Sequence, residues 1–183
     1  MILTDREIRI ALQNGVIKID PLPDLTVAIA STSIDLTLSH TFREWPGTKG
    51  VSIQPAAEGY KYSDLVKLQV KVPDGRYTLR PQHLVLGWTA ESVEIPYTSR
   101  LAARVEGKSS LSRLGISVHT TAPTIHSGFK GPIQLEICNH GPHDVILDAG
   151  MWVCQLIFEV TTGTPERGYA GIFQEQTAGG LKT

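Results

Sequence analysis

Hydroxyl and cationic side chains gather in one short run of the chain, residues 105–115, which reads VEGKSSLSRLG. Hydroxyl groups can donate hydrogen bonds to phosphate oxygens and cations can neutralise their charge, so this composition suits a phosphate group. The glycines at positions 107 and 115 would let backbone amides approach such an anion closely. A polar turn between two strands accounts for the same composition equally well. The side chains concerned are those of Lys108, Ser109, Ser110, Ser112 and Arg113.

A carboxylate interrupts an apolar segment further along the chain. Glu136 lies in PIQLEICN, residues 132–139, directly between two apolar neighbours. Strict alternation along a strand places it on the same face as Gln134 and Cys138. A carboxylate in such a strand either has a structural partner or works as an acid–base group whose pKa is tuned by burial. A phosphate site nearby would favour the second interpretation.

A loop with binding potential separates these two features. The stretch HTTAPTIHSGFKG, residues 119–131, contains one proline and two glycines and is typical of a strand that ends in a tight loop. Loops of this kind often carry binding residues. His126 is the candidate here, and a solvated loop histidine is the structural alternative.

Two common forms of catalysis find no support in the residues. No GxSxG motif is present, and Ser109 adjoins cationic residues rather than an evident base, which disfavours a serine nucleophile. The chain has six histidines, but HExxH, CxxC and the HxE…PCxxC signature of zinc deaminases are absent. We therefore expect no zinc site. Cys138 and Cys154 lie in apolar runs and are predicted to be small buried hydrophobes, with a reactive or disulfide role as the alternative.

The elements that position these residues are mostly strands. Residues 4–14 predict a short amphipathic helix, with Thr4 as N-cap, Glu7 completing a capping box and Gly15 as the stop. Many short β-rich segments with turn signals between them then predict a sandwich or barrel. The segment at 152–160 is apolar on both predicted faces, which favours an oligomer. The predicted strands fall within residues 16–19, 31–38, 65–72, 77–79, 83–89, 101–107, 116–120, 132–139, 144–150 and 151–160.

Composition limits the class of protein. We expect one domain over residues 1–183, with a mobile C-terminal tail from about residue 163. A formal net charge of -1 gives no support to nucleic-acid binding, which usually shows a basic excess. No apolar run approaches the roughly 18 residues that span a bilayer, and the N-terminus has no signal-peptide pattern. We therefore expect a cytoplasmic protein with neither a membrane nor a nucleic acid as partner.

Taken in order, several motifs resemble one known family. GKSSLSRLG, a loop with a TA pair and a GFKG segment, IQLEICN and GMWVCQLIFE follow an N-terminal MILTDREIRIALQNGVIKIDP and STSIDLTL. This succession is similar to the dCTP deaminase branch of the trimeric dUTPase superfamily, from Met1 to about Gln176. The resemblance implies a mainly β protomer, a distorted β-barrel or jelly roll with a short N-terminal helix. It also implies a homotrimer with shared active sites.

The resemblance also implies chemistry: zinc-independent hydrolytic deamination of dCTP, with magnesium bound through the triphosphate and dTTP as a candidate inhibitor. Glu136 would be the catalytic base toward water attacking C4, while Ser109, Arg113 and the backbone carbonyl of Ala122 hold that water. Gln134 and Leu135 would read the pyrimidine edge. The C-terminal tail would close over the ligand and supply the remaining nucleotide contacts. Further nucleotide-binding positions by resemblance are Lys108, Ser110, Leu111, Ser112, His126, Gln155, Tyr169 and Gln176.

Five positions, at four sites, depart from the family pattern. Lys108 stands where arginine is usual and loses the bidentate fork. His126 replaces an aspartate that contacts the deoxyribose 3′-hydroxyl and, in dUTPases, orients the attacking water, which counts against plain dUTPase activity. Pro123-Thr124 matches neither the His-Arg of single-function deaminases nor the Gly-aromatic pair of bifunctional ones, and Ile172 replaces a phosphate-binding lysine.

Three hypotheses remain for the function. The first is a dCTP deaminase that forms dUTP for thymidylate supply. The second is a dUTP diphosphatase or a bifunctional deaminase–diphosphatase. The third is a non-catalytic nucleotide-binding protein, suggested by the changes at His126 and Ile172.

Overall fold

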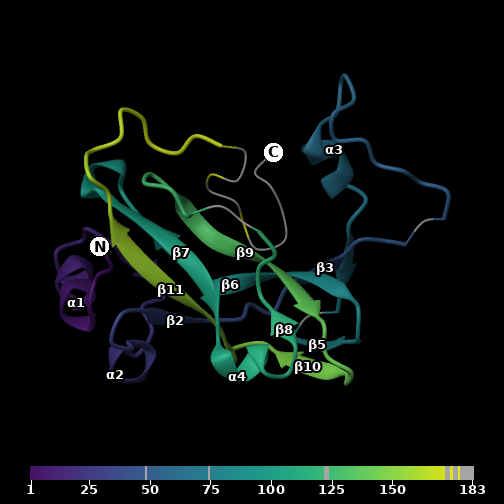
Figure 1. The fold of residues 1–183 in the computed structure, drawn as a ribbon, viewed down its shortest axis with the longest axis horizontal. Helices are drawn as coiled ribbons and strands as arrows, with labels where there is room; N and C mark the ends of the chain where they lie inside the picture. The colour runs from purple at the N-terminus through teal and green to yellow at the C-terminus, as the bar shows by residue number, and fades with distance from the viewer. Residues whose placement is uncertain (48, 74, 122–123, 172–173, 175–176, 178–183) are drawn as a thin grey trace.

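Antiparallel strands dominate the computed structural model of the chain (Figure 1), which describes residues 1–47, 49–73, 75–121, 124–171, 174 and 177. The mainly β class predicted from the sequence is confirmed. In chain order the elements are α1 (Asp5–Gln13), β1 (Lys18–Asp20), α2 (Leu25–Ala28), β2 (Ile34–Thr37), β3 (Phe42–Glu44), α3 (Tyr62–Val66), β4 (Val70–Val72), β5 (Arg76–Leu79), β6 (Leu84–Glu94), the 3-10 turn η1 (Tyr97–Ser99), β7 (Leu101–Gly107), α4 (Ser109–Ser112), β8 (Ile116–Ser117), β9 (Lys130–Asn139), β10 (Val145–Asp148) and β11 (Trp152–Val160).

The strands are arranged in three sheets. The largest has the order β4-β3-β6-β9-β8, and β1 also pairs with β6. Its centre is the antiparallel pair of β6 and β9, which runs from Leu84 opposite Cys138 to Glu94 opposite Lys130 with a register shift between Trp88 and Ser92. The order of the second sheet is β2-β11-β7, and β5 pairs with β10 in the third. Leu38, just after β2, bridges to Thr89 of β6 and so connects the two larger sheets.

The sheets do not close into one barrel within the described part of the chain, so the barrel expectation is corrected. Closure needs an unbroken ring of hydrogen-bonded strands. The largest sheet instead ends at β4 and at β8, and β8 contributes only Ile116 opposite Asn139 and Ser117 opposite Cys138. Beyond that point the chain leaves the sheet for the loop that leads to β9. An open edge of β9 results, and it becomes important at the candidate site.

Alternation along the strands builds the core and exposes the candidate residues. On β9 the residues Leu135 and Ile137 are fully buried, whereas Gln134 and Glu136 lie on the opposite, partly exposed face. This confirms the face predicted for Glu136. A single apolar cluster joins inward residues of all the larger elements, among them Ile8, Leu36, Val85, Leu135, Leu156 and Phe158.

The N-terminal helix matches its prediction. The Thr4 backbone N–H donates to Glu7 Oε2 at 3.3 Å, and the Thr4 side chain faces the Glu7 backbone N–H, which together form a capping box. The Thr4 hydroxyl also donates to the Glu7 carboxylate. Ile8 and Ala11 are the buried face of α1, and Gly15 follows with φ +67°. No helix among the described residues is long and apolar enough to cross a membrane.

One strand prediction is wrong in its bounds, and β11 is covered on one face within this chain. Residues 65–72 were predicted as one strand, but Leu65 and Val66 complete α3, and only Val70–Val72 form β4. On β11, a register irregularity between Trp152 and Cys154 is followed by regular alternation. Leu156 and Phe158 are buried there, while Ile157 on the other face is only partly covered. Within this chain the strand is therefore fully covered on one face.

The end of the serine-rich run is anchored by a backbone-to-backbone contact. His140 N donates to Gly115 O at 2.8 Å, and the fully buried Asn139 holds its turn by accepting from Gly141 N at 2.9 Å and donating to Leu79 O at 2.9 Å. A Cβ added at Gly115 would lie 2.4 Å from Gly141 N, closer than atoms approach. Position 115 also has φ +89°, so glycine is required for two independent reasons.

We expect Gly115→Ala to lower the free energy of unfolding by about 2 kcal/mol or more, because it combines backbone strain with a clash. Urea unfolding followed by circular dichroism measures this. Gly150→Ala is the matched control, since Gly150 has φ +82° but nothing within 4 Å of an added Cβ. It should cost only the strain, roughly 1–2 kcal/mol. If Gly115→Ala and Gly150→Ala lose the same free energy of unfolding, the close contact between positions 115 and 141 does not contribute.

Candidate active site

A cavity of about 710 Å³ opens between β7, β9 and the loop that joins β8 to β9. Residues 104–106 of β7 and 133–136 of β9 form two of its walls. Loop side chains and Tyr169 from the C-terminal segment complete it. The other lining residues are His119, Thr120, Thr121, Thr124, Ile125, His126 and Phe129.

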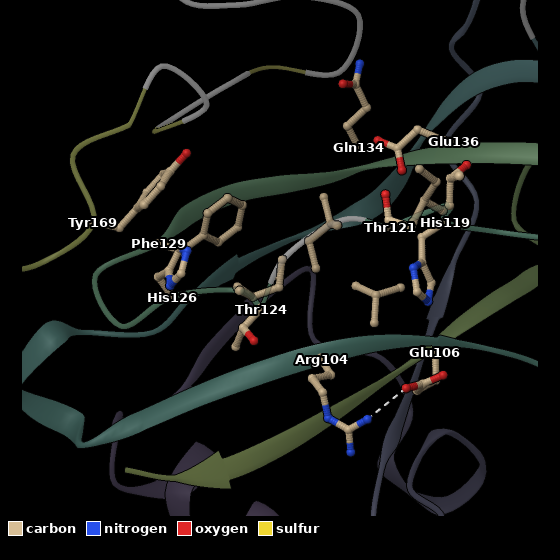
Figure 2. Close-up of a pocket in the computed structure, with 15 residues that line it drawn as sticks. Arg104, Glu106, His119, Thr121, Thr124, His126, Phe129, Gln134, Glu136 and Tyr169 are labelled. Atoms are coloured by element: carbon tan, nitrogen blue, oxygen red, sulfur yellow. Dashed lines mark hydrogen bonds and ion pairs between the residues drawn. The ribbon is translucent and has the colours of Figure 1, made fainter. Parts of the chain in front are cut away.

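The two ends of this cavity differ in chemistry. Figure 2 shows Glu136 and His119 together at one end, with Glu106 below them. His126 and Tyr169 lie at the other end, stacked with ring centroids 5.6 Å apart and an angle of 21° between planes. One end therefore offers groups that can move protons, and the other offers flat aromatic surfaces.

Glu136 has the properties of an acid–base group. Burial is the largest influence on its carboxylate and raises the pKa of Glu136, because the charged form loses hydration. Backbone N–H groups of Thr120 and of Glu136 itself donate to it, and together with nearby His119 they partly oppose that rise. A carboxyl group with a raised pKa is a stronger base when ionised and can accept and return a proton, which is the requirement for general acid–base catalysis.

The backbone of β9 next to Glu136 is open to a ligand. β6 pairs with one edge of β9, but β8 covers the other edge only at Cys138 and Asn139. Gln134 and Leu135 therefore have no strand partner on that side within the described part of the chain. Their position at the cavity allows backbone groups to read the edge of a planar ring.

The cavity has no unpaired cationic side chain among its described lining residues. Arg104 is its basic residue, and its Nη1 donates to Glu106 Oε1 at 2.9 Å while its Nε donates to Glu159 Oε1 at 2.8 Å (the first contact is the dashed line in Figure 2). Two carboxylates thus neutralise one guanidinium. A highly charged anion such as a triphosphate would need cations from another source.

The serine-rich run lies outside this cavity. Lys108 is the N-cap of α4, and Ser109, Ser110, Ser112 and Arg113 are exposed. None of residues 108–113 lines the cavity. Leu111 is partly buried and packs against the core. The side chains of Ser109, Ser110, Ser112 and Arg113 therefore point away from the cavity and are accessible to another molecule.

Lys108 is already engaged within the chain. Its Nζ forms an ion pair with Asp35 of β2, whose other oxygen accepts Gln155 Nε2 at 3.0 Å. The predicted nucleotide contacts Lys108 and Gln155 thus meet at Asp35 rather than in the cavity. Asp35 itself was not singled out from the sequence, although it lies in the STSIDLTL motif.

Of the residues predicted from the sequence, the cavity brings together His126, Gln134, Leu135, Glu136 and Tyr169. Ala122 and Gln176 lie outside the described residues, as do the departures Pro123 and Ile172. No described group of three or more His, Cys, Asp or Glu side chains is placed to hold a metal ion. Cys138 and Cys154 are both free, the first partly exposed and the second buried, where burial raises the pKa of its thiol.

Sequence reasoning missed several lining residues. His119 was considered only as a metal ligand, yet its ring lies in the cavity with Nδ1 buried and without a hydrogen-bond partner among the described residues. Arg104 and Glu106 could have been found from the alternation of LAARVEG, which places both on one face. Tyr62 of α3 lies close enough for the charge of Glu136 to contribute to the raised pKa of its phenol, although burial contributes more.

Comparison with known proteins assigns the arrangement to a family. The family model described as dCTP deaminase-like matches residues 2–161. The chain belongs to this family. A family protein of Methanothermobacter thermautotrophicus, named dCTP deaminase, dUMP-forming, is 38% identical over 92% of this chain and 83% of its own length. One of Halorubrum lacusprofundi, named dCTP deaminase, is 40% identical over 92% of this chain and 82% of its own.

The fold is shared with a solved member of the family. The crystal structure of 2′-deoxycytidine 5′-triphosphate deaminase from Agrobacterium tumefaciens superposes with a TM-score of 0.65 at 23% identity. The match covers 87% of this chain and 48% of that chain, so the present chain corresponds to about half of its length. The predicted resemblance to the dCTP deaminase family is thereby confirmed.

The raised pKa of Glu136 predicts a pH dependence of stability. Above the ordinary value of 4.5 the folded protein binds more protons at this residue than the unfolded chain does. The stability of the wild type relative to Glu136→Gln should therefore be highest below pH 4.5 and should fall as pH rises through the raised pKa. Urea unfolding of both proteins between pH 4 and pH 7, at about one-unit steps, measures the difference. A difference that stays constant, or that grows with pH, would contradict the raised pKa.

The Lys108–Asp35 ion pair predicts energetic coupling. Its side chains are only 20% and 13% exposed, so each charge depends on the other. A double-mutant cycle with Lys108→Met and Asp35→Asn should give a coupling of about 1 kcal/mol or more in urea unfolding. The Arg76–Asp148 pair is the control, at 70% and 50% exposure, and should couple by less than about 0.5 kcal/mol. Similar coupling in the two cycles would show that burial of Lys108 is unimportant.

Proposed function

We propose that this protein is a dCTP deaminase, which hydrolyses the cytosine amino group of dCTP to give dUTP and ammonia without zinc. One observation carries the proposal: a partly buried carboxyl group with a raised pKa, Glu136, at the polar end of a cavity beside an open strand edge. The names of relatives 38% and 40% identical over nearly the whole chain support it.

The mechanism follows from the position of Glu136. The pyrimidine lies against the open edge of β9, where backbone groups of Gln134 and Leu135 read its polar edge. Glu136 takes a proton from a water molecule as the water oxygen bonds to C4. The carboxyl group passes this proton to ring nitrogen N3. It then takes the second proton from the new C4 hydroxyl and transfers it to the departing amino group. Cleavage of the C4–N4 bond releases ammonia and leaves the C4 carbonyl of uracil.

The triphosphate requires a second copy of the chain. Arg104, the arginine among the described lining residues, is paired with two carboxylates, whereas Ser109, Ser110 and Arg113 are exposed outside the cavity. We therefore place the α4 run of one subunit over the cavity of another, in a homotrimer with shared sites. Ser109, Arg113 and the Ala122 carbonyl then hold the water. Magnesium enters with the triphosphate, as the family resemblance implies.

Three further features complete this proposal. dTTP, which has the same triphosphate and a similar ring, competes for the cavity as an inhibitor. The C-terminal tail, with Tyr169 and Gln176, closes over the ligand. The enzyme works in the cytoplasm, where it supplies deoxyuridine nucleotides for thymidylate synthesis.

A bifunctional activity is the second candidate. The relative from Methanothermobacter thermautotrophicus is named dUMP-forming and is almost as similar, at 38%, as the dCTP deaminase of Halorubrum lacusprofundi at 40%. Such an enzyme would also remove pyrophosphate. His126 argues against this reaction, because the residue has no carboxylate to orient a water toward phosphorus. A non-catalytic nucleotide-binding protein is the remaining alternative.

Incubation with dCTP, dUTP, CTP or dTTP and magnesium, followed by chromatography, separates these functions. We expect dUTP and ammonia from dCTP, and Glu136→Gln should reduce the rate by about 10²–10⁴-fold, the usual contribution of a general base. Glu58→Gln, at an exposed carboxylate, is the control and should retain wild-type activity. dUMP and pyrophosphate as products would instead establish the bifunctional enzyme. Binding of nucleotides without turnover of any of them would contradict the deaminase assignment.

A further inference from the structure

The loop that carries His126 is firmly attached to the body of the protein. Ile125 and Ala103 of β7 exchange two backbone hydrogen bonds, at 2.7 and 2.9 Å. The Ser127 hydroxyl, which is buried, donates to Leu101 O, and Gly128 N donates to Ile95 O at 2.6 Å. These contacts make the loop a fixed platform at the aromatic end of the cavity.

Part of the C-terminal segment rests on this platform. We call its described residues, 168–171 and 174, the strap. Tyr169 N donates to Ser127 O at 2.9 Å, and Gln174 Nε2 donates to Gly128 O at 2.8 Å. A Cβ added at Gly128 would lie 2.5 Å from Tyr169 N, so the backbone of the strap approaches where only glycine leaves room.

Ring contacts reinforce the backbone contacts. His126 stacks on Tyr169 at 5.6 Å and 21°, and Phe129 packs against the same ring at 6.2 Å and 47°. All three residues line the cavity, and Figure 2 shows the tyrosine ring standing at its aromatic end. Tyr169 is therefore part of the cavity wall.

We propose that His126 is a positioning residue, whose stack with Tyr169 docks the strap over the cavity before a nucleotide binds. The docking itself rests on the contacts above, and only its benefit for dCTP rests on the proposed function. A carboxylate at position 126 would face the electron-rich side of the Tyr169 ring and could not replace the stack. An imidazole can. Docking in advance lowers the entropy lost on binding, which improves affinity through preorganisation.

Amide hydrogen exchange of the nucleotide-free, full-length protein tests this directly. We expect the Tyr169 amide to be protected in the wild type and to exchange about threefold to tenfold faster in His126→Asp, the shift that loss of one aromatic stack produces. His126→Phe keeps a flat ring and should retain protection. If His126→Asp does not fold, Tyr169→Ala and Tyr169→Phe make the same comparison from the strap. Exchange of the amide at position 169 should be faster in Tyr169→Ala, which loses the ring, and should stay slow in Tyr169→Phe, which keeps it.

Kinetics provides the second measurement. For dCTP, the KM of His126→Ala should rise by a larger factor than its kcat falls, and the KM of His126→Phe should stay close to that of the wild type. The proposal would be overturned if the Tyr169 amide is unprotected in the wild type. It would also be overturned if this amide exchanges at the same rate in the wild type and in His126→Asp. A third contradicting result would be that His126→Phe loses as much protection of the Tyr169 amide as His126→Asp does. The exchange results hold whether or not dCTP is turned over, so failure of docking and failure of the deaminase assignment are distinguishable.

Discussion

The antiparallel pairing of β6 with β9 is the constraint on which the site depends. Its register places Glu136 opposite Leu86 and Gln134 opposite Trp88. Leu135 and Ile137 fill the core from the other face. Because the side chains of a strand alternate, a shift of one residue would bury the carboxylate among apolar groups and expose two core residues. The core therefore fixes where the acid–base group stands, and its desolvation follows from the same packing.

Separation of charge is the second organising feature. The cavity contains carboxylates and a neutralised guanidinium, while the hydroxyls and Arg113 of the α4 run are exposed elsewhere. A nucleotide has both a neutral ring and a strongly anionic tail, and within the described residues these two kinds of surface lie apart.

Much of the local structure could be predicted because its causes are local. The capping box at Thr4, the alternation in PIQLEICN and the loop position of His126 all follow from residue type and spacing. Residues 65–72 were predicted incorrectly because a short apolar run fits a strand or a buried helical turn equally well. The short strand β3 was not predicted at all. Its pairing with β4 and β6 comes from segments distant in the chain.

By itself, the sequence determined the mainly β class, the family and the chemical character of Glu136 and the serine-rich run. The tertiary structure decided which of these residues meet. It joined Glu136 to His119, tied Lys108 to Asp35 and placed Tyr169 on His126. The physical reason is that side-chain type and strand period are written in neighbouring residues, whereas desolvation, ion pairing and ring stacking depend on groups brought together from distant parts of the chain.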